Sequence, residues 1–145
     1  MNVDPEPAPV PDLPLVAGAL YSPGQIGLAT FLGAPIAGCW LLAANYAALG
    51  KRDARRRTLI YGALGTIVML AIAYFLPEHF PNVVLPAVYT VTLRGVAERE
   101  QGKLFNAHVQ GGGRKHSSWR AAGIGLVWLA AILAACTLVL LLLPS

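Results

Sequence analysis

The chain has 145 residues, of which 56% are hydrophobic and only 12% are charged, and its formal net charge at pH 7 is +4. About a quarter of the residues of a soluble domain are charged. The 11 basic and 7 acidic residues of this chain are therefore too few to cover a soluble surface. The composition excludes an ordinary soluble domain, and the positive charge has to be judged by where the basic residues lie.

Three long stretches carry no charged residue: 25–50, 58–77 and 121–145. A helix of about 20 apolar residues crosses the hydrocarbon core of a bilayer. The alternating strands of a membrane β-barrel are only about 10 residues long, so these stretches are too long and too uniformly apolar for a barrel. The sequence therefore predicts transmembrane helices over 24–49, 58–76 and 120–143.

A fourth stretch is shorter, because the apolar run Val83–Leu93 is followed by Arg94. Eleven helical residues extend only about 16 Å. This stretch spans the membrane as 83–97 if the Arg94 side chain reaches the headgroups. All 11 basic residues then lie on one face, as expected for the cytoplasmic side. A re-entrant segment would instead place six of them on the opposite face, so spanning is the favoured interpretation.

These patterns predict an all-α integral membrane protein with four transmembrane helices in one bundle and both termini outside the cytoplasm. The third helix is short and continues as a cytoplasmic amphipathic extension. Residues 1–21 form an acidic, proline-rich extracytoplasmic tail, and 22–145 form a single four-helix transmembrane domain (about 24–49, 58–76, 83–97 and 120–143). Ser22 is a suitable N-cap for the first helix, with Pro23 at its first position.

Small residues line the first predicted helix at helical spacing, a pattern that lets helix backbones approach closely in lipid. Pro35 removes one backbone hydrogen bond and predicts a kink near 31–35. This thin helix serves either packing within the bundle, the favoured interpretation, or docking of another protein. The predicted helix-packing residues are Ala29, Gly33, Ala34, Pro35, Ala37 and Gly38.

Polar residues near the membrane are candidates for a polar path or for pairing, and they are Asn45, Thr90, Arg94 and Glu98. An ionisable residue at membrane depth is a candidate functional residue. Glu98 lies one helical turn after Arg94, however, where it is a suitable ion-pair partner. Pairing and snorkelling together explain Arg94 without a function.

Basic residues flank the predicted helices and are expected to fix the topology and to contact anionic lipid headgroups, each contributing about 1 kcal/mol. The residues expected to do this are Lys51, Arg52, Arg55, Arg56, Arg57, Arg114, Lys115 and Arg120, together with the interfacial Trp119. No aromatic platform or recognition motif accompanies these charges, so nucleic acid is not an expected partner. The glycines at 111–113 lack the spacing of a phosphate-binding loop and are interpreted as a hinge.

The sequence contains no recognisable catalytic motif, and no carboxylate lies inside a predicted span. His108 and His116 would make a weak metal site at best. We therefore expect no catalytic residues, no metal and no cofactor, and the chain is not expected to be an enzyme.

Two functions remain as hypotheses. The first is a non-catalytic membrane protein that acts through helix–helix contacts, as an accessory subunit, an assembly factor or an immunity-type factor of a membrane partner. The second is a small oligomeric transporter or channel. The expected partners are anionic lipid headgroups on the cytoplasmic side and either another membrane protein or further copies of this chain. The alanine-, glycine- and arginine-rich composition suggests a multi-pass protein of a bacterial inner membrane.

Overall fold

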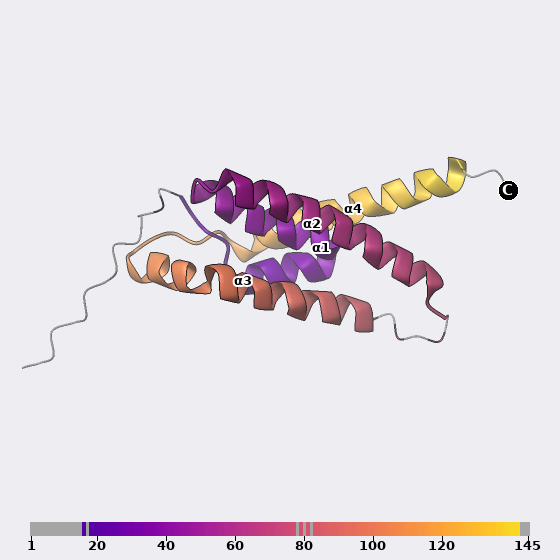
Figure 1. The fold of residues 1–145 in the computed structure, drawn as a ribbon, viewed down its shortest axis with the longest axis horizontal. Helices are drawn as coiled ribbons and strands as arrows, with labels where there is room; N and C mark the ends of the chain where they lie inside the picture. Colours follow the sequence, from indigo (N-terminus) through magenta and orange to yellow (C-terminus); the bar gives the residue numbers. More distant parts are fainter. Residues whose placement is uncertain (1–15, 17, 78, 80, 82, 143–145) are drawn as a thin grey trace, which may run out of the picture.

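A computed structural model of the protein describes residues 16, 18–77, 79, 81 and 83–142, and its regular structure is helical. The helices are α1 (Pro23–Ala48), α2 (Arg52–Phe75), α3 (Val84–Gln110) and α4 (Ser118–Leu142), as Figure 1 shows. Judged by length and composition alone, α1, α2 and α4 are each long enough and apolar enough to cross a membrane. The chain is therefore an all-α membrane protein. Of the predicted proline-rich tail 1–21, residues 1–15 and 17 lie outside the described residues, whereas Leu20 and Tyr21 are described and buried against the bundle.

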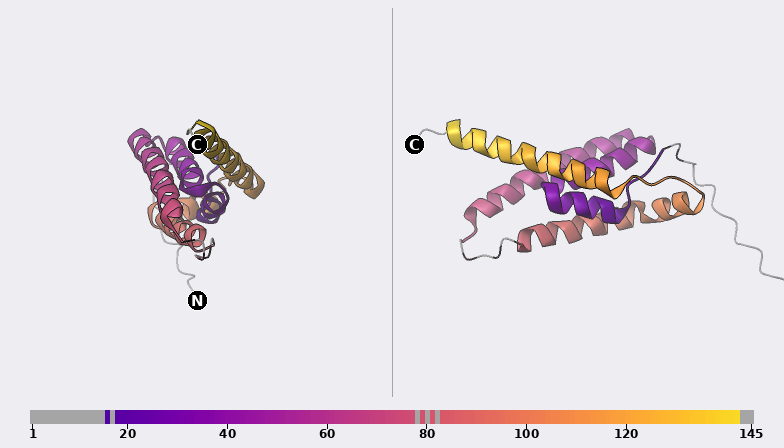
Figure 2. Two further views of the ribbon diagram at one scale, coloured as in Figure 1. Left: turned by 90° about the vertical axis from the view of Figure 1, so that its right-hand side faces the viewer. Right: turned by 180° about the vertical axis from the view of Figure 1, so that it is seen from behind.

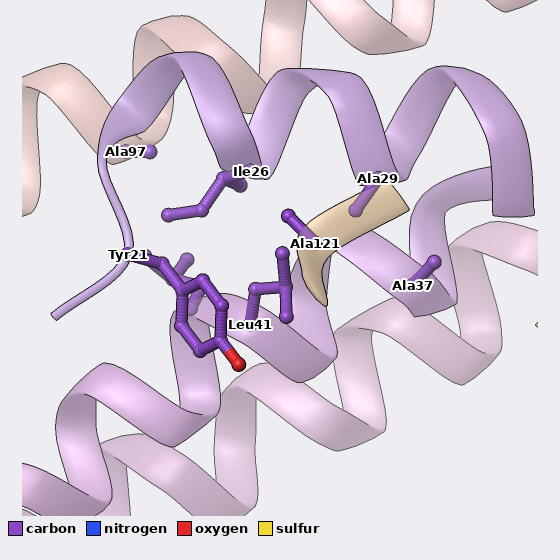
Figure 3. Packing of buried hydrophobic residues seen from close by; sticks show 8 residues of the cluster. Tyr21, Ile26, Ala29, Ala37, Leu41, Ala97 and Ala121 are labelled. Carbon is purple, nitrogen blue, oxygen red and sulfur yellow. The ribbon is translucent and has the colours of Figure 1, made fainter. Parts of the chain in front are cut away.

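Helix α1 is folded back on itself. Its backbone leaves the helical region at Gly33 and Ala34. The Tyr21 N–H donates to Asn45 Oδ1 at 2.8 Å, and Asn45 Nδ2 donates to the Tyr21 carbonyl at 2.9 Å. A straight helix would separate these two residues by about 36 Å. Residues 23–32 and 35–48 are thus the first and second halves of a helical hairpin, which is visible in Figures 2 and 3.

The prediction of a single kinked helix that crosses the membrane over 24–49 is therefore wrong. The two halves are about 15 and 21 Å long, and each is too short to cross a hydrocarbon core of about 30 Å. The two ends of α1 lie together, so the prediction that they face opposite sides of the membrane is also wrong. The predicted kink near 31–35 is a reversal of direction.

The reversal has a local cause in Pro35. Proline disfavours the helical conformation at the residue before it, and Ala34 adopts φ 62° and ψ 178°. This region is used almost only by glycine and costs about 1–3 kcal/mol for other residues. The Ile36 N–H donates to Thr66 Oγ1 of α2 at 3.0 Å. A side chain at Gly33 would overlap the Gly125 carbonyl of α4. The turn is therefore buried and held between α2 and α4.

Helix α1 is the centre of the bundle. Helices α2, α3 and α4 each pack against α1 and make few contacts with one another. Figure 3 shows the apolar core between the two halves of α1, which comprises Tyr21, Ile26, Ala29, Ala37, Leu41, Leu42, Ala97 and Ala121. Glycine permits the closest approaches, because a Cβ at Gly38 would overlap Thr30 and Leu93. The core is built on α1, and the other helices surround it.

The basic residues gather at one end of the molecule. Both ends of α1, the start of α2, the end of α3 and the start of α4 lie at this basic end, on the left in Figure 1. The opposite far end holds the end of α2, the start of α3 and the end of α4. Helix α3 runs without interruption to Gln110, so the expected continuation of the third helix beyond 97 is confirmed.

The sign of one mutational effect distinguishes the hairpin from a straight helix. We expect Ala34→Gly to raise the free energy of unfolding by about 1 kcal/mol, because glycine adopts the observed backbone angles without strain. In a continuous helix the same change would lower it by about 1 kcal/mol. Thermal unfolding in a mild detergent measures the difference.

The matched control is Ala44→Gly, in the exposed face of the second half. It should lower the stability by about 1 kcal/mol, as in any helix interior. Equal losses for both variants would contradict the hairpin.

Candidate functional site

A cluster of hydrogen-bonded polar groups, most of them buried, closes the open end of the hairpin. We call Tyr21, Gln25, Asn45, Gln101 and His116 the polar clamp. Asn45 is its centre, because its Nδ2 also donates to Gln101 Oε1 of α3 at 2.8 Å. Gln101 Nε2 in turn lies 3.4 Å from the Leu42 carbonyl. Every polar atom of the Asn45 amide group is thus paired inside the protein, which ties both halves of α1 to α3.

Gln25 connects the hairpin to α4. Ser22 caps α1 as predicted: its Oγ accepts from the Gln25 N–H at 3.2 Å, and its N–H donates to Gln25 Oε1 at 2.9 Å. The Gln25 Nε2 atom then donates to the His116 carbonyl at 2.6 Å and lies 3.3 Å from Ser118 Oγ. One glutamine therefore completes the cap of α1 and fixes the start of α4.

The segment before α1 and the segment before α4 run side by side. The Leu20 N–H donates to the Arg114 carbonyl at 3.1 Å, and the His116 N–H donates to the Leu20 carbonyl at 3.0 Å. The rings of Tyr21 and His116 stack with centroids 4.2 Å apart. Burial and the nearby Arg120 charge lower the pKa of His116, against an opposing hydrogen bond to Ala19. A neutral imidazole stacked on Tyr21 is the result at neutral pH.

The predicted polar residues are not brought into one path. Asn45 is buried in the polar clamp. Arg94 and Glu98 form an exposed ion pair at 3.2 Å on α3, and the Arg94 stem lies against Gly27. Among the described residues, Thr90 Oγ1 is a buried oxygen without a hydrogen-bond partner. These groups therefore occupy separate places along the bundle.

The predicted helix-packing residues all lie in the interior. Ala29, Gly33, Ala34, Pro35, Ala37 and Gly38 are buried between α1 and its neighbours. The predicted headgroup-binding residues are all at the basic end, and Trp119 is 87% exposed there. The small-residue face of α1 around the turn is therefore covered by other helices of the same chain.

Two hollows lie on the surface near the start of α4. One, which we call the basic hollow, has a volume of about 700 Å³ and is lined by Arg114, Lys115 and Arg120 together with the glycines before them. The other, the apolar groove, has a volume of about 560 Å³ and is lined by Trp40 of α1 and by the α4 residues Arg120, Gly123, Ile124, Val127 and Trp128. Arg120 lines both.

The amide side chains of the polar clamp, Gln25, Asn45 and Gln101, are not acid–base groups, because asparagine and glutamine do not titrate. Their donors and acceptors are engaged with backbone groups and with one another. Within the described part of the chain, no three His, Cys, Asp or Glu residues gather where they could hold a metal ion. The geometry fits a structural role for the polar clamp.

Sequence reasoning missed the roles of Tyr21, Thr66, Gln101 and His116. A partial signal was present: Gln25 and Asn45 are polar residues near the two ends of one apolar stretch, and both need partners. The partners of these residues lie up to 93 positions away along the chain, and nothing in the local pattern points to them.

Comparison of the chain with protein-family models, with curated proteins and with solved structures found no match. The fold itself defines a general class, that of helical membrane proteins organised around an internal helical hairpin.

Replacing Asn45 tests the polar clamp. We expect Asn45→Leu to lower the free energy of unfolding by about 2 kcal/mol, because it leaves the buried Tyr21 backbone and Gln101 without partners. Asn106→Leu is the matched control, since Asn106 is exposed on α3. Thermal unfolding in detergent should show the loss for Asn45→Leu only. An equal effect of the two substitutions would show that Asn45 does not hold the hairpin.

Proposed function

We propose that this protein is a non-catalytic membrane protein that acts through contacts of its transmembrane helices with another membrane protein. Accessory subunits, assembly factors and immunity-type factors all work in this way. The observation that carries the proposal is the shape of the far half of the molecule. There the outer helices extend beyond the α1 turn, and each loses its packing partner.

The exposure of the outer helices supports this proposal. None of the residues at 67–75 of α2, 84–96 of α3 or 126–142 of α4 is buried. Helices in lipid associate through close van der Waals packing rather than through the hydrophobic effect. Lipid alone could cover these apolar surfaces, so the choice of a protein partner rests on the pattern of small residues.

Small residues are exposed on the far half of α4. Ala130 and Ala134 lie four residues apart, as do Ala131 and Ala135, and all are exposed. Such spacing permits close helix–helix approach. The similar pattern on α1 is occupied within the chain, whereas the pattern on α4 is free among the described residues. We therefore place the partner-binding face on the far half of α4.

We also propose an orientation. The basic end faces the cytoplasm, according to the rule that basic loops stay inside. Helices α2 and α4 start at this end and α3 returns to it, so these helices cross the membrane while α1 enters and leaves on the cytoplasmic side. The bacterial inner membrane suggested by the composition is the proposed location.

A small oligomeric transporter or channel is the alternative function. It is favoured by the hairpin, because short half-membrane helices bring non-helical backbone to membrane depth. Against it, the turn is buried in protein rather than open to a cavity, and the polar candidates do not share one path. We therefore rank it second.

The partner-binding face is tested by cross-linking in native membranes followed by purification in a mild detergent. We expect the unmodified protein to retain one membrane partner, and Ala134→Leu to reduce its recovery about tenfold, equivalent to about 1.4 kcal/mol. The control Ala87→Leu makes the same change at an exposed site on α3 and should leave recovery unchanged.

Other results of this cross-linking experiment would favour the alternative function or overturn the proposal. Capture only of further copies of this chain, together with ion or solute flux in proteoliposomes, would favour the alternative function. Equal recovery with Ala134→Leu and Ala87→Leu, or no cross-linked protein at all, would overturn the proposal.

A further inference from the structure

The basic hollow and the apolar groove meet at Arg120, which lines both. Arg120 lies in the first turn of α4, beside the exposed Trp119 that marks the membrane interface. A cationic surface and an apolar surface thus adjoin each other at the depth of the lipid headgroups. This arrangement matches the two parts of an amphipathic ligand.

The apolar groove is built from one face of α4 and one ring of α1. Gly123 and Val127 lie four residues apart on α4, as do Ile124 and Trp128, so they share one face of the helix. The Trp40 and Trp128 rings pack at a tilt with centroids 5.6 Å apart. A Cβ at Gly123 would meet no atom within 4 Å, so glycine leaves the groove open. The groove has the apolar lining to hold a hydrocarbon chain.

The basic hollow supplies positive charge for the other part of the ligand. Arg114, Lys115 and Arg120 line it, and no acidic residue is among its lining residues in the part of the chain that the structure describes. Arginine and lysine bind phosphate oxygens through charge-assisted hydrogen bonds. The neutral His116 adds no positive charge at neutral pH but contributes an imidazole ring to the wall.

We propose that these two hollows form one binding site for an anionic phospholipid, with its phosphate in the basic hollow and one acyl chain in the apolar groove. A soluble anion would leave the apolar groove unused, and a partner helix would not need the cationic hollow. Only a lipid with a negative headgroup uses both. The inference depends on the membrane location of the chain but not on the proposed protein partner, whose face lies on the far half of α4.

Native mass spectrometry of the purified full-length protein tests this site. The protein is mixed in detergent with phosphatidylglycerol or with phosphatidylcholine, and the retained lipid is counted. We expect one tightly retained phosphatidylglycerol and about tenfold weaker retention of phosphatidylcholine, since a charge-assisted contact of this kind is worth about one factor of ten.

Two pairs of variants locate the site. Arg120→Gln should weaken retention of phosphatidylglycerol about tenfold, whereas Arg99→Gln, the same change of charge on the exposed surface of α3, should not. Gly123→Leu should displace the acyl chain and weaken retention by a similar factor, whereas Gly95→Leu, also in open space, should not. Melting temperatures of all four variants near that of the unmodified protein show that the fold is intact.

The proposal is overturned if the two lipids are retained equally, or if Arg120→Gln behaves like Arg99→Gln. It is also overturned if Gly123→Leu leaves phosphatidylglycerol in place but abolishes recovery of a protein partner, because the apolar groove would then be a protein-binding face. Failure of Ala134→Leu to affect partner recovery has no bearing on these results, so the two proposals fail separately.

Discussion

Backbone N–H and C=O groups inside a bilayer need hydrogen-bond partners, and a chain that reverses direction at membrane depth breaks the helical pattern that supplies them. The turn of α1 meets this constraint by being buried. Pro35 has no N–H to satisfy, the Ile36 N–H is bonded to Thr66, and the Thr66 hydroxyl donates to the Gly62 carbonyl at 2.9 Å. Glycines on α2 and α4 let both helices approach the turn closely.

The arrangement of the bundle follows from this turn. The hairpin must be surrounded, so α2, α3 and α4 pack around α1 instead of around one another. At the open end, the polar clamp holds α1 to α3 and to the start of α4. At the turn, Thr66 holds it to α2. The outer helices are longer than either half of α1, which leaves their far halves without a common core.

The helical, membrane-embedded nature of the chain could be predicted from composition, because lipid leaves few alternatives for long uncharged stretches. The hairpin could not be predicted from length or charge. Residues 24–49 are numerous enough to span, and no basic residue precedes Lys51. A straight first helix and a hairpin therefore both leave every basic residue on one face, and the positive-inside rule does not distinguish them.

Residue types alone gave part of the candidate site. Asn45 and the pairing of Arg94 with Glu98 were visible as local patterns, whereas Tyr21, Gln101 and Thr66 matter only because the hairpin brings them to α1. The small residues of α1 predict close packing, but not which helices pack there. With α1 at the centre, its small-residue face is covered within the chain, and the surfaces open to a partner or ligand lie on α4 and at the hollows of the basic end.

The hairpin is tested most directly by one distance in proteoliposomes. Spin labels are placed at Gly24→Cys and Ala47→Cys, after the native Cys39 and Cys136 are replaced by alanine, and the distance is measured by electron paramagnetic resonance. The hairpin predicts a distance below about 20 Å, because two packed helices lie about 10 Å apart. A distance near 35 Å, the length of 23 residues of straight helix, would contradict the hairpin and the topology built on it.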